Sequence, residues 1–317
     1  MTGNRIVVTG ASSFIGRHLM PYLVQNGYTR LVAVTRSAGK IESIDPSLEL
    51  AEGDILDPVF LLGLLNTDDV LINLLHIPKG SSEHYQNDNF RVAENLMASA
   101  RSNRPKLILH CSTTEVVGRT MESSVTEQTT CHPINDYQKL KLAIEHRLLD
   151  FSKETGIPVA ILRLSEVFGP GGRGLNSIIQ TLAQGSRINN LWKTFILGNR
   201  RTHYIHISKV LSAFYQVMHL DSRDSPLSLI VADDVPDNHY RRVAREILES
   251  YGKKGCLSPV SVPNAIVKLY FRFFKYSLDC SYTISGGKMA EVGVSFSTTF
   301  RQDLRSYLDW YKVNAGK

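Results

Sequence analysis

Tyr137 and Lys141 are the two residues whose types and spacing most directly suggest chemistry. They open a stretch with helical periodicity, and residues four positions apart share one face of a helix. An ammonium close to a phenol favours the phenolate and lowers the pKa of the phenol from about 10. We therefore expect Tyr137 to exchange a proton with a substrate carbinol or carbonyl near neutral pH. The alternative is an amphipathic surface pair, so the assignment depends on the surrounding motifs.

A glycine-containing turn follows the first short apolar run of the chain, Ile6 to Val8. Such a turn lets the backbone approach a pyrophosphate, which then lies at the N-terminus of the next helix. The outer glycines of the dinucleotide-binding pattern are present, but a serine stands at the middle position. Serine is compatible with this position if its φ is negative, and its hydroxyl could donate to a phosphate. The predicted phosphate-binding residues are Gly10, Ser12, Ser13, Phe14, Ile15 and Gly16. The alternative is a helix cap without a ligand.

The end of the second predicted strand carries Arg36 and no acid, although NAD-binding proteins usually place a carboxylate there. A guanidinium recognises a phosphate with a fork of donors, so Arg36 favours the 2′-phosphate of NADP. The alternative is a solvated surface arginine with NAD as the cofactor. Asp54 follows the third predicted strand and is placed to accept from the adenine amino group.

Apolar runs and helical segments alternate through the first half of the chain, which predicts a parallel sheet covered by helices on both faces. The predicted strands are 6–8, 31–34, 48–52, 70–75, 106–110 and 159–164. We expect an α/β protein of the Rossmann type, a doubly wound parallel sheet. Residues 1–165 are predicted to form the NAD(P)-binding domain and residues 166–317 a smaller α/β substrate-binding domain. Residues 202–220 are expected to return to the first domain.

Composition excludes several classes of protein. The 317 residues are 43% hydrophobic and 21% charged, which is enough apolar material for a core. The net charge of +6 favours anionic ligands, but no basic stripe typical of nucleic-acid binding is present. Four scattered cysteines and ten histidines show no metal-ligand spacing, so we expect neither a metal site nor disulfides. No apolar run approaches the roughly 18 residues that cross a bilayer, and none resembles a signal peptide. We expect a cytoplasmic protein with no integral membrane segment.

Further motifs make the chain resemble an extended short-chain dehydrogenase/reductase of the nucleotide-sugar epimerase/dehydratase family. The resemblance runs over nearly the whole sequence. Besides the first turn and the Tyr137–Lys141 pair, it rests on His110 to Gly118, Asn89 to Leu96, Arg163 to Gly171 and Arg201 to Ile207. It implies NADP, or alternatively NAD, as the cofactor and a nucleotide-diphosphate sugar as the substrate. It also implies a homodimer formed through a four-helix bundle that includes the Tyr137 helix.

The resemblance assigns a role to each matching residue. Tyr137 is the acid/base, Lys141 orients the nicotinamide ribose, and Thr113 hydrogen-bonds the reacting oxygen, with Ser112 as the alternative. Arg201 binds the substrate diphosphate, helped by Arg173. The remaining substrate contacts implied are Thr113, Thr114 and Glu115. The remaining cofactor contacts implied are Ile55, Leu75, Tyr137, Lys141, Leu164 and Val167.

Departures from the family pattern bear on the type of reaction. In the 4,6-dehydratases an acid precedes the residue that corresponds to Glu115, and here that position is Thr114. A threonine hydroxyl is too weak an acid to expel water from C6, which argues against dehydration. Val117 stands where the family has a tyrosine that contacts the substrate. Ser208 and Lys209 stand where the family has an acid after its Tyr-Ile-His segment.

A finer resemblance points to the branch that contains NDP-4-keto-6-deoxy-sugar 4-reductases and their 4-epimerase relatives. It rests on residues 169–174, 182–185 and 198–201. An epimerase returns its hydride and suits tightly held NAD, whereas a reductase consumes NADPH in each turnover. Because Arg36 favours NADP, we predict reduction of an NDP-4-keto sugar at C4, in polysaccharide biosynthesis. A nucleotide-sugar 4-epimerase is the alternative, and a non-catalytic NADP-binding sensor or structural subunit is a further one.

Overall fold

The computed structural model describes residues 3–36, 39, 48–80, 84–220, 225–233, 235, 238–263, 266 and 282–314. The chain divides into two compact units. Unit 1 comprises Met1–Gly118, Pro133–Arg163 and Leu211–Leu229, and unit 2 comprises Arg119–His132, Leu164–Val210 and Ile230–Lys317. Residues 119–132 thus belong to unit 2 although they precede residue 165, and the segment 202–220 is shared between the two units.

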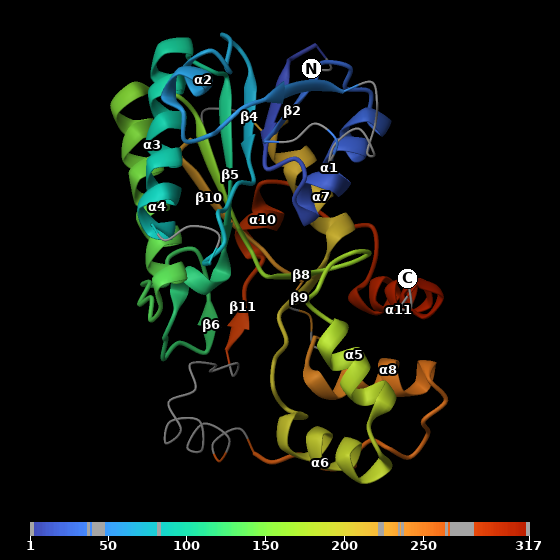
Figure 1. Ribbon diagram of the computed structural model, residues 1–317. Coiled ribbons are helices and arrows are strands. Elements are labelled where there is room, and N and C mark those ends of the chain that lie inside the picture. The colour runs from blue at the N-terminus through green and yellow to red at the C-terminus, as the bar shows by residue number, and fades with distance from the viewer. Residues whose placement is uncertain are drawn as a thin grey trace. The chain divides into compact units, whose positions relative to one another are not determined.

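A seven-stranded sheet runs through the structure (Figure 1). Its strands are β1 (Ile6–Thr9), β2 (Leu31–Thr35), β3 (Glu49–Glu52), β4 (Val70–Asn73), β5 (Leu107–Thr113), β7 (Val159–Leu164) and β10 (Leu227–Val231), in the spatial order β10-β7-β5-β4-β1-β2-β3. The pairs β1–β2, β1–β4, β2–β3 and β4–β5 are parallel. The strand order reverses between β1 and β4, which is the switch point where doubly wound sheets bind ligands at their carboxyl ends. The predicted Rossmann-type fold is confirmed.

The strands form where the sequence predicts them because their apolar residues are buried on both faces. Every residue of β1, β2, β4 and β7 is buried. The edge strand β3 instead exposes Glu49 and Glu52, which leaves a charged rim that discourages pairing with another chain. The seventh strand, β10, is absent from the sequence prediction. Its five-residue run is too short for periodicity to separate it from a helix or a loop.

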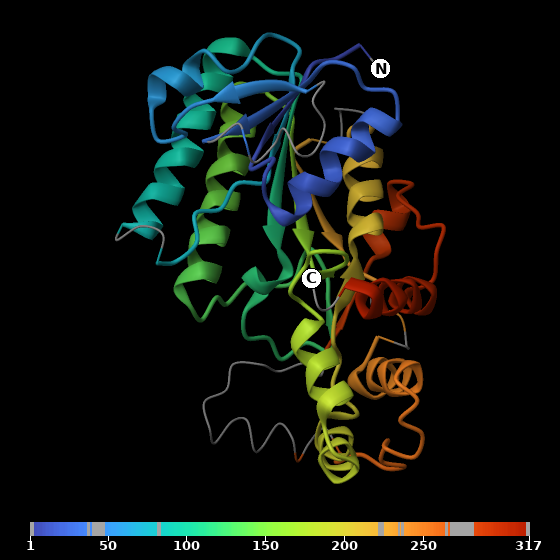
Figure 2. The ribbon, with the colours of Figure 1, turned by 45° about the vertical axis from the view of Figure 1, so that its right-hand side comes forward.

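Helices cover both faces of the sheet (Figures 1 and 2). On one face lie α1 (Phe14–Gln25) and α7 (Ile207–Val217), whose rings Tyr22 and Tyr215 meet edge to face. On the other face lie α3 (Tyr85–Asn103) and α4 (Asp136–Thr155), with the short α2 (Pro58–Leu62) against α3. The core on this second face combines residues of α3 and α4 with strand residues, among them Leu96, Ile144, Leu148, Leu71 and Ile161.

The helix α4 positions the Tyr137–Lys141 pair. Its N-cap Asn135 accepts a hydrogen bond from the backbone N–H of Gln138 at 2.9 Å, and the helix ends at Gly156 in the left-handed conformation, φ +72°. Leu140, Ile144 and Leu148 of α4 are buried in the core of unit 1. These leucines and isoleucine therefore anchor α4 on the sheet, which holds its first two turns at the carboxyl end of β5.

Unit 2 is a separate, smaller assembly. The strands β8 (Glu166–Phe168) and β9 (Tyr204–His206) pair in parallel, as do β6 (Ser124–Val125) and β11 (Thr283–Ile284). Its helices are α5 (Asn176–Gln184), α6 (Arg187–Leu197), α8 (Tyr240–Ser250), α10 (Gly287–Glu291) and α11 (Phe300–Asn314). Phe168 and Tyr307 lie at the centre of its apolar core. In the part of the chain that the structure describes, none of the helices combines the length and apolar character needed to cross a membrane.

Candidate active site

The backbone conformation of the turn between β1 and α1 explains why positions 10 and 16 are glycine and why position 13 accommodates a serine. Gly10 has φ +72°, and a Cβ there would lie 3.1 Å from the carbonyl carbon of Leu74. A Cβ on Gly16 would lie only 2.5 Å from the backbone oxygens of Gly10 and Ala11. Ser13 has φ −69°, so the condition set for a serine at the middle position is met. Its Oγ accepts from the Gly16 N–H at 3.1 Å, which caps α1 and leaves the hydroxyl hydrogen to donate.

A buried polar chain joins the carboxyl ends of the three central strands. Thr9 of β1 donates to Oδ1 of Asn73 at 2.7 Å, and Asn73 of β4 donates through Nδ2 to Nδ1 of His110, on β5, at 3.2 Å. Asn73 Oδ1 also accepts from the Leu75 N–H at 3.1 Å. Burial, with Lys141 adding to it, lowers the pKa of His110 well below its ordinary value, so the ring is neutral. This chain sets the path of residues 74 and 75 beside Gly10.

Sequence analysis does not identify Thr9, Asn73 and His110. Their signal is that each is the first polar residue after an apolar run in its strand, toward the end where the strand meets the ligand edge of a doubly wound sheet.

Tyr137 and Thr113 come together as predicted. Thr113, the last residue of β5, lies beside the side chain of Tyr137 in the first turn of α4, and its hydroxyl acts to lower the pKa of Tyr137. Thr113 Oγ1 also accepts from the Glu115 N–H at 3.2 Å and so caps the 3₁₀ turn η2 (Thr114–Val117). Ser112, the alternative to Thr113, has a buried hydroxyl without a hydrogen-bond partner among the described residues. Thr113 is therefore the better-placed hydroxyl.

The expected effect of Lys141 on Tyr137 is wrong for this arrangement. Lys141 is buried, and its Nζ donates to the Cys111 carbonyl oxygen at 3.0 Å. Burial raises the pKa of Tyr137 above its ordinary value, and the Glu115 carboxylate raises it further, whereas the Thr113 hydroxyl acts in the opposite direction. Burial also lowers the pKa of Lys141 itself. Because desolvation penalises the phenolate, Tyr137 is held protonated at neutral pH.

His76 is a further neighbour of Tyr137 and is absent from the predicted site residues. Its ring meets the Tyr137 ring edge to face, with centroids 5.1 Å apart, and meets the Tyr85 ring at 6.0 Å. Burial, and then the Lys141 ammonium, lower the pKa of His76 to about 4, while a hydrogen bond to the Asn89 side chain opposes the shift. His76 is therefore a neutral ring at pH 7.

Asn89 of α3 holds the loop that carries His76. Its side chain accepts from the Ile77 N–H and donates to the Ile77 carbonyl, each at 2.9 Å, and donates to the Tyr85 carbonyl at 2.7 Å. The asparagine that the family resemblance highlights is thus a clamp on the segment after β4.

The remaining predicted cofactor residues of unit 1 lie along the carboxyl edge of its sheet. Arg36 is exposed directly after β2. Asp54 is exposed after β3, and its carboxylate accepts from the Leu56 N–H at 2.9 Å. Ile55 is buried in the core, and Leu75 is half-buried next to it.

The other predicted residues occupy unit 2 or its border. Leu164 ends β7 and is buried, whereas Val167 in β8 is half-buried. Arg201 is half-buried, forms an antiparallel bridge with His239, and donates through Nη1 to the Val235 carbonyl at 3.3 Å. Arg173 is exposed.

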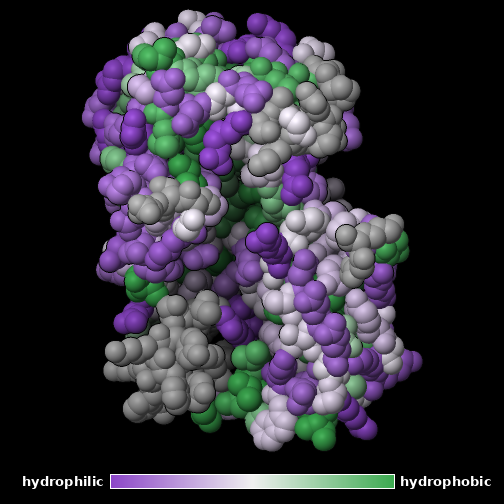
Figure 3. All heavy atoms as spheres, viewed as in Figure 1, coloured by the Kyte–Doolittle hydropathy of each residue, from purple (hydrophilic) through white to green (hydrophobic). Residues whose placement is uncertain are grey.

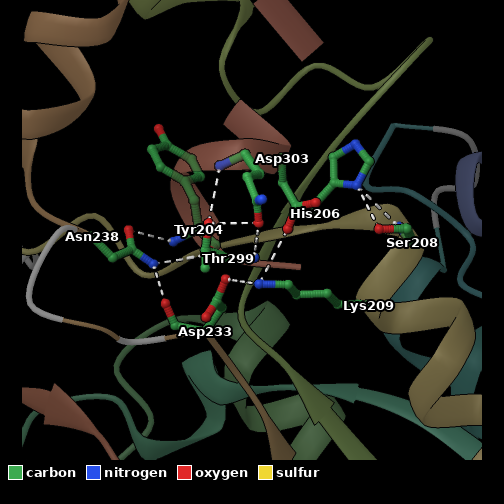
Figure 4. A network of polar contacts seen from close by, with 9 residues as sticks. Tyr204, His206, Ser208, Lys209, Asp233, Asn238, Thr299 and Asp303 are labelled. Atoms are coloured by element: carbon green, nitrogen blue, oxygen red, sulfur yellow. Dashed lines mark hydrogen bonds and ion pairs between the residues drawn. The ribbon is translucent and has the colours of Figure 1, made fainter. Parts of the chain in front are cut away.

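In unit 2, Lys209 belongs to a buried cluster of charged side chains (Figure 4). The Lys209 ammonium forms ion pairs with Asp233 and, at 3.1 Å, with Asp303 of α11; all three side chains are buried. Asn238 bridges neighbouring backbone, donating to the carbonyls of Tyr204 at 2.7 Å and Asp233 at 2.8 Å. The lysine that departs from the family pattern is therefore matched by two carboxylates, and the cluster joins the β9–α7 junction to α11.

Across the described residues, no group of three or more His, Cys, Asp or Glu side chains is arranged to hold a metal ion.

The comparison with protein families agrees with the fold. Residues 6–231 match the NAD dependent epimerase/dehydratase family. The chain belongs to this family, within the extended short-chain dehydrogenases/reductases, and the resemblance stated from the sequence is confirmed.

Two curated relatives are similar to parts or nearly all of the chain. It is 26% identical over 204 residues to a UDP-glucose 4-epimerase of Lactobacillus helveticus, covering 62% of this chain and 61% of that protein. It is 23% identical over 334 residues to a trifunctional UDP-glucose 4,6-dehydratase/UDP-4-keto-6-deoxy-D-glucose 3,5-epimerase/UDP-4-keto-L-rhamnose-reductase of Arabidopsis thaliana, covering 98% of this chain and 47% of that protein. The chain therefore spans about half to three fifths of the length of these relatives.

Solved structures share the fold over almost the entire chain. A UDP-glucuronic acid 4-epimerase from Bacillus cereus, in complex with UDP-glucuronic acid and NAD, has a TM-score of 0.72 at 20% identity and covers 98% of this chain and 99% of its own. A dTDP-glucose 4,6-dehydratase from Streptomyces venezuelae with NAD bound has a TM-score of 0.74 at 20% identity and covers 98% of each chain.

Proposed function

We propose that this chain is an NADP(H)-dependent oxidoreductase that acts on a nucleotide-activated sugar, and that it reduces an NDP-4-keto sugar at C4. The observation that carries the proposal is the state of Tyr137. Its phenol lies beside the Thr113 hydroxyl and is kept protonated by burial and by Glu115. A protonated phenol beside a second hydroxyl suits the transfer of a proton to a carbonyl oxygen, as reduction requires.

The turn after β1 supports dinucleotide binding. Side chains are excluded at Gly10 and Gly16, because a Cβ at either position would collide with or crowd backbone. The N-terminus of α1 is therefore open to a pyrophosphate, to which the Ser13 hydroxyl can donate. Arg36, exposed after β2, would hold the 2′-phosphate of NADP, and Asp54 the adenine.

When bound, NADPH supplies a hydride to the carbonyl carbon of the sugar. Tyr137 gives its proton to the carbonyl oxygen, and Thr113 holds the same oxygen by a hydrogen bond. Lys141 uses one N–H for the Cys111 carbonyl, and its remaining donors are available for the ribose hydroxyls. Carbon gains the hydride and oxygen the proton, so the ketone becomes an alcohol.

Substrate binding is proposed for Thr113, Thr114 and Glu115 in unit 1 and for Arg173 and Arg201 in unit 2. The guanidinium groups match the two negative charges of a diphosphate. We extend the proposal to a cytoplasmic homodimer in polysaccharide biosynthesis, for which the support is the family resemblance.

A nucleotide-sugar 4-epimerase is the second candidate. It is favoured by the similarity to UDP-glucose 4-epimerase and UDP-glucuronic acid 4-epimerase. An epimerase starts by taking a proton from a carbinol, which needs a phenolate. A reductase uses only the proton-donating half of this chemistry, which suits the protonated phenol of Tyr137.

Incubation with NADPH and a panel of NDP-4-keto sugars tests the proposal. Stoichiometric NADPH oxidation supports the reductase. Inversion at C4 without net oxidation would assign the epimerase, and cofactor binding with neither reaction would assign a sensor or structural subunit.

Tyr137→Phe provides the matched test of the proton donor. We expect kcat to fall by about 10²–10⁴-fold, since general acid catalysis contributes that much. The affinity for NADPH, measured by quenching of protein fluorescence, should stay close to that of the unaltered protein. Retained turnover in this variant would contradict the role of Tyr137.

A further inference from the structure

The helix α6 turns large apolar side chains toward solvent. Ile188, Trp192 and Ile196 are 66%, 59% and 45% exposed. They stand four positions apart and so follow one another along one side of the helix. The buried residues of α6 are the polar Asn190 and Thr194, and the helix packs against α8. Leu191, Phe195 and Leu197 of the same helix are half-buried, so Ile188, Trp192 and Ile196 form an additional apolar side of α6 that faces solvent.

The segment beside α6 extends the exposed apolar area. Ser258 donates its N–H to Thr194 Oγ1 at 2.9 Å, and Val262 donates its N–H to the Phe195 carbonyl at 2.8 Å. Val260 lies between these two contacts and is 61% exposed. We call Ile188, Trp192, Ile196 and Val260 the α6 surface. Contiguous exposed apolar side chains of this kind mark interaction sites.

The rim of the α6 surface carries positive charge. Lys253 reaches the N-terminal end of α6, where its Nζ donates to the Gly185 carbonyl at 2.8 Å, and Lys254 beside it is exposed. Arg241 donates to the Pro259 carbonyl at 2.7 Å, next to Val260. Arg187 and Lys193 belong to α6 itself.

Few carboxylates are available to neutralise the positive charge of this rim. The residues before, within and after α6 include none, and the buried carboxylate of α8 pairs with arginines of α11. The sequence from Val167 to Leu220 contains no Asp or Glu. Glu246 of α8 is buried and pairs with Arg301 and Arg305 of α11, at 2.6 Å each, which leaves the exposed Glu249 as the other carboxylate of α8. The positively charged rim therefore favours a partner that carries negative charge, and the apolar α6 surface favours a partner with an apolar region.

We propose that the α6 surface binds the face of a membrane that contains anionic lipids. Ile188, Trp192, Ile196 and Val260 would enter the boundary between headgroups and acyl chains, where tryptophan is favoured. The surrounding Lys and Arg side chains would contact the anionic headgroups. A second copy of the chain fits less well, because a symmetric contact would bring two cationic rims together. Figure 3 shows hydrophobic and strongly hydrophilic side chains side by side at the lower end of the molecule, where Figure 1 labels α6.

Vesicle binding by the full chain tests this proposal independently of the enzymatic one. The chain has two tryptophans, so Trp310→Phe makes Trp192 the single reporter. We expect its emission to shift to the blue with phosphatidylcholine vesicles that contain phosphatidylglycerol. The shift should weaken with added salt, since exposed charges are screened beyond about 10 Å at 0.1 M ionic strength. It should be small with pure phosphatidylcholine.

Substitutions on the surface should remove the binding. The triple variant Ile188→Ser, Trp192→Ser, Ile196→Ser is expected to lower vesicle partitioning in flotation by at least about tenfold. The matched control, Val59→Ser, Leu62→Ser, Met121→Ser, removes apolar side chains that are exposed elsewhere and should bind like the unaltered chain. Lys193→Glu with Lys254→Glu should reduce binding to anionic vesicles only.

Three results would overturn the proposal. The first is no binding of the unaltered chain to anionic vesicles. The second is equal loss in the triple variant and its control. The third is a concentration-dependent oligomer, seen by analytical ultracentrifugation, that the triple variant alone abolishes, which would assign the surface to a second copy. Circular dichroism of each variant separates loss of binding from loss of folding.

Discussion

The phenol of Tyr137 shares its surroundings with Thr113 and Glu115, which lie at the junction of β5 and η2, and with His76 from the segment after β4. Burial acts first in raising the pKa of Tyr137, and Glu115 adds to it. Lys141, one turn along α4, is engaged by the Cys111 carbonyl. The charged group that shifts the pKa of Tyr137 is therefore the Glu115 carboxylate and not the Lys141 ammonium. It favours the protonated phenol, which is the form that donates a proton.

Replacing Glu115 by Gln should shift the pH dependence of reduction. The reaction needs the protonated phenol, so kcat falls as pH rises through the pKa of Tyr137. Removing the carboxylate lowers that pKa, and the fall of kcat should begin at a lower pH than in the unaltered enzyme. The pH profile of NADPH oxidation measures this, with the exposed Glu52→Gln as control. An unchanged profile, or a fall displaced to higher pH, would contradict the role given to Glu115.

His76→Ala removes the ring that supports Tyr137. An edge-to-face pair contributes about 0.5–1.5 kcal/mol, so we expect kcat to fall about two- to tenfold while NADPH affinity stays the same. His76→Phe keeps a ring at the position and should retain most of kcat. Steady-state kinetics with kcat and KM reported separately test both variants. An equal loss in the alanine and phenylalanine variants would show that the ring contact is not what matters.

A buried ion pair adds to the apolar contacts that attach the helix α4 to the sheet. Arg163 of β7 donates through Nε to both carboxylate oxygens of Glu145 in α4, at 3.2 and 3.1 Å, and through Nη2 at 2.7 Å. Both side chains are buried. Glu145 lies one turn beyond Lys141, so this pair and the apolar residues of α4 together hold the catalytic turn in place.

Glu145→Ala should destabilise the protein strongly. Removing one partner leaves the Arg163 charge buried without its carboxylate, which costs about 3–5 kcal/mol of unfolding free energy. The control is Asp150→Ala, which removes a surface contact with Lys153 at 3.8 Å and should cost less than about 1 kcal/mol. Urea titrations of both variants give the comparison. Similar losses in the two would mean that the buried pair adds nothing beyond a surface pair.

At the scale of the whole molecule, two neutral histidines make folding sensitive to acid. Burial lowers the pKa of His110 well below its ordinary value and that of His76 to about 4, and Lys141 contributes to both shifts. In the unfolded chain each histidine titrates near pH 6.5. Below that pH the unfolded state binds protons that the folded state does not, so stability falls as the solution is acidified.

The pH dependence of stability should therefore become shallower in His110→Gln. Between about pH 6.5 and 5, one buried neutral histidine contributes up to about 1.4 kcal/mol of lost stability per pH unit. Melting temperatures from pH 5 to 8 measure the slope, since 1 kcal/mol corresponds to a few degrees for a protein of this size. His146→Gln, on the exposed side of α4, serves as the control. Identical slopes for the unaltered chain and His110→Gln would contradict the assignment.

Much of the fold follows from the sequence alone, because buried strands need continuous apolar runs. The runs at 6–8, 31–34, 70–75 and 159–164 became central strands, and the turn from Gly10 to Gly16 lies where its glycines predict. The strand β10 could not be foreseen, since a five-residue segment with four apolar side chains fits a helix as well as a strand. In the candidate site, spacing places Tyr137 and Lys141 on one helix, and the family resemblance adds Thr113.

What the spacing leaves open is the electrostatic state of those residues. Lys141 points to the Cys111 carbonyl, Glu115 acts on Tyr137, and His76 lies against its ring. Likewise, Lys209 is neutralised by carboxylates at positions 233 and 303. The sequence therefore determined which elements form and which side chains sit on them. Only the tertiary structure decided how those side chains are charged, because pKa values depend on burial and on groups brought together from distant parts of the chain.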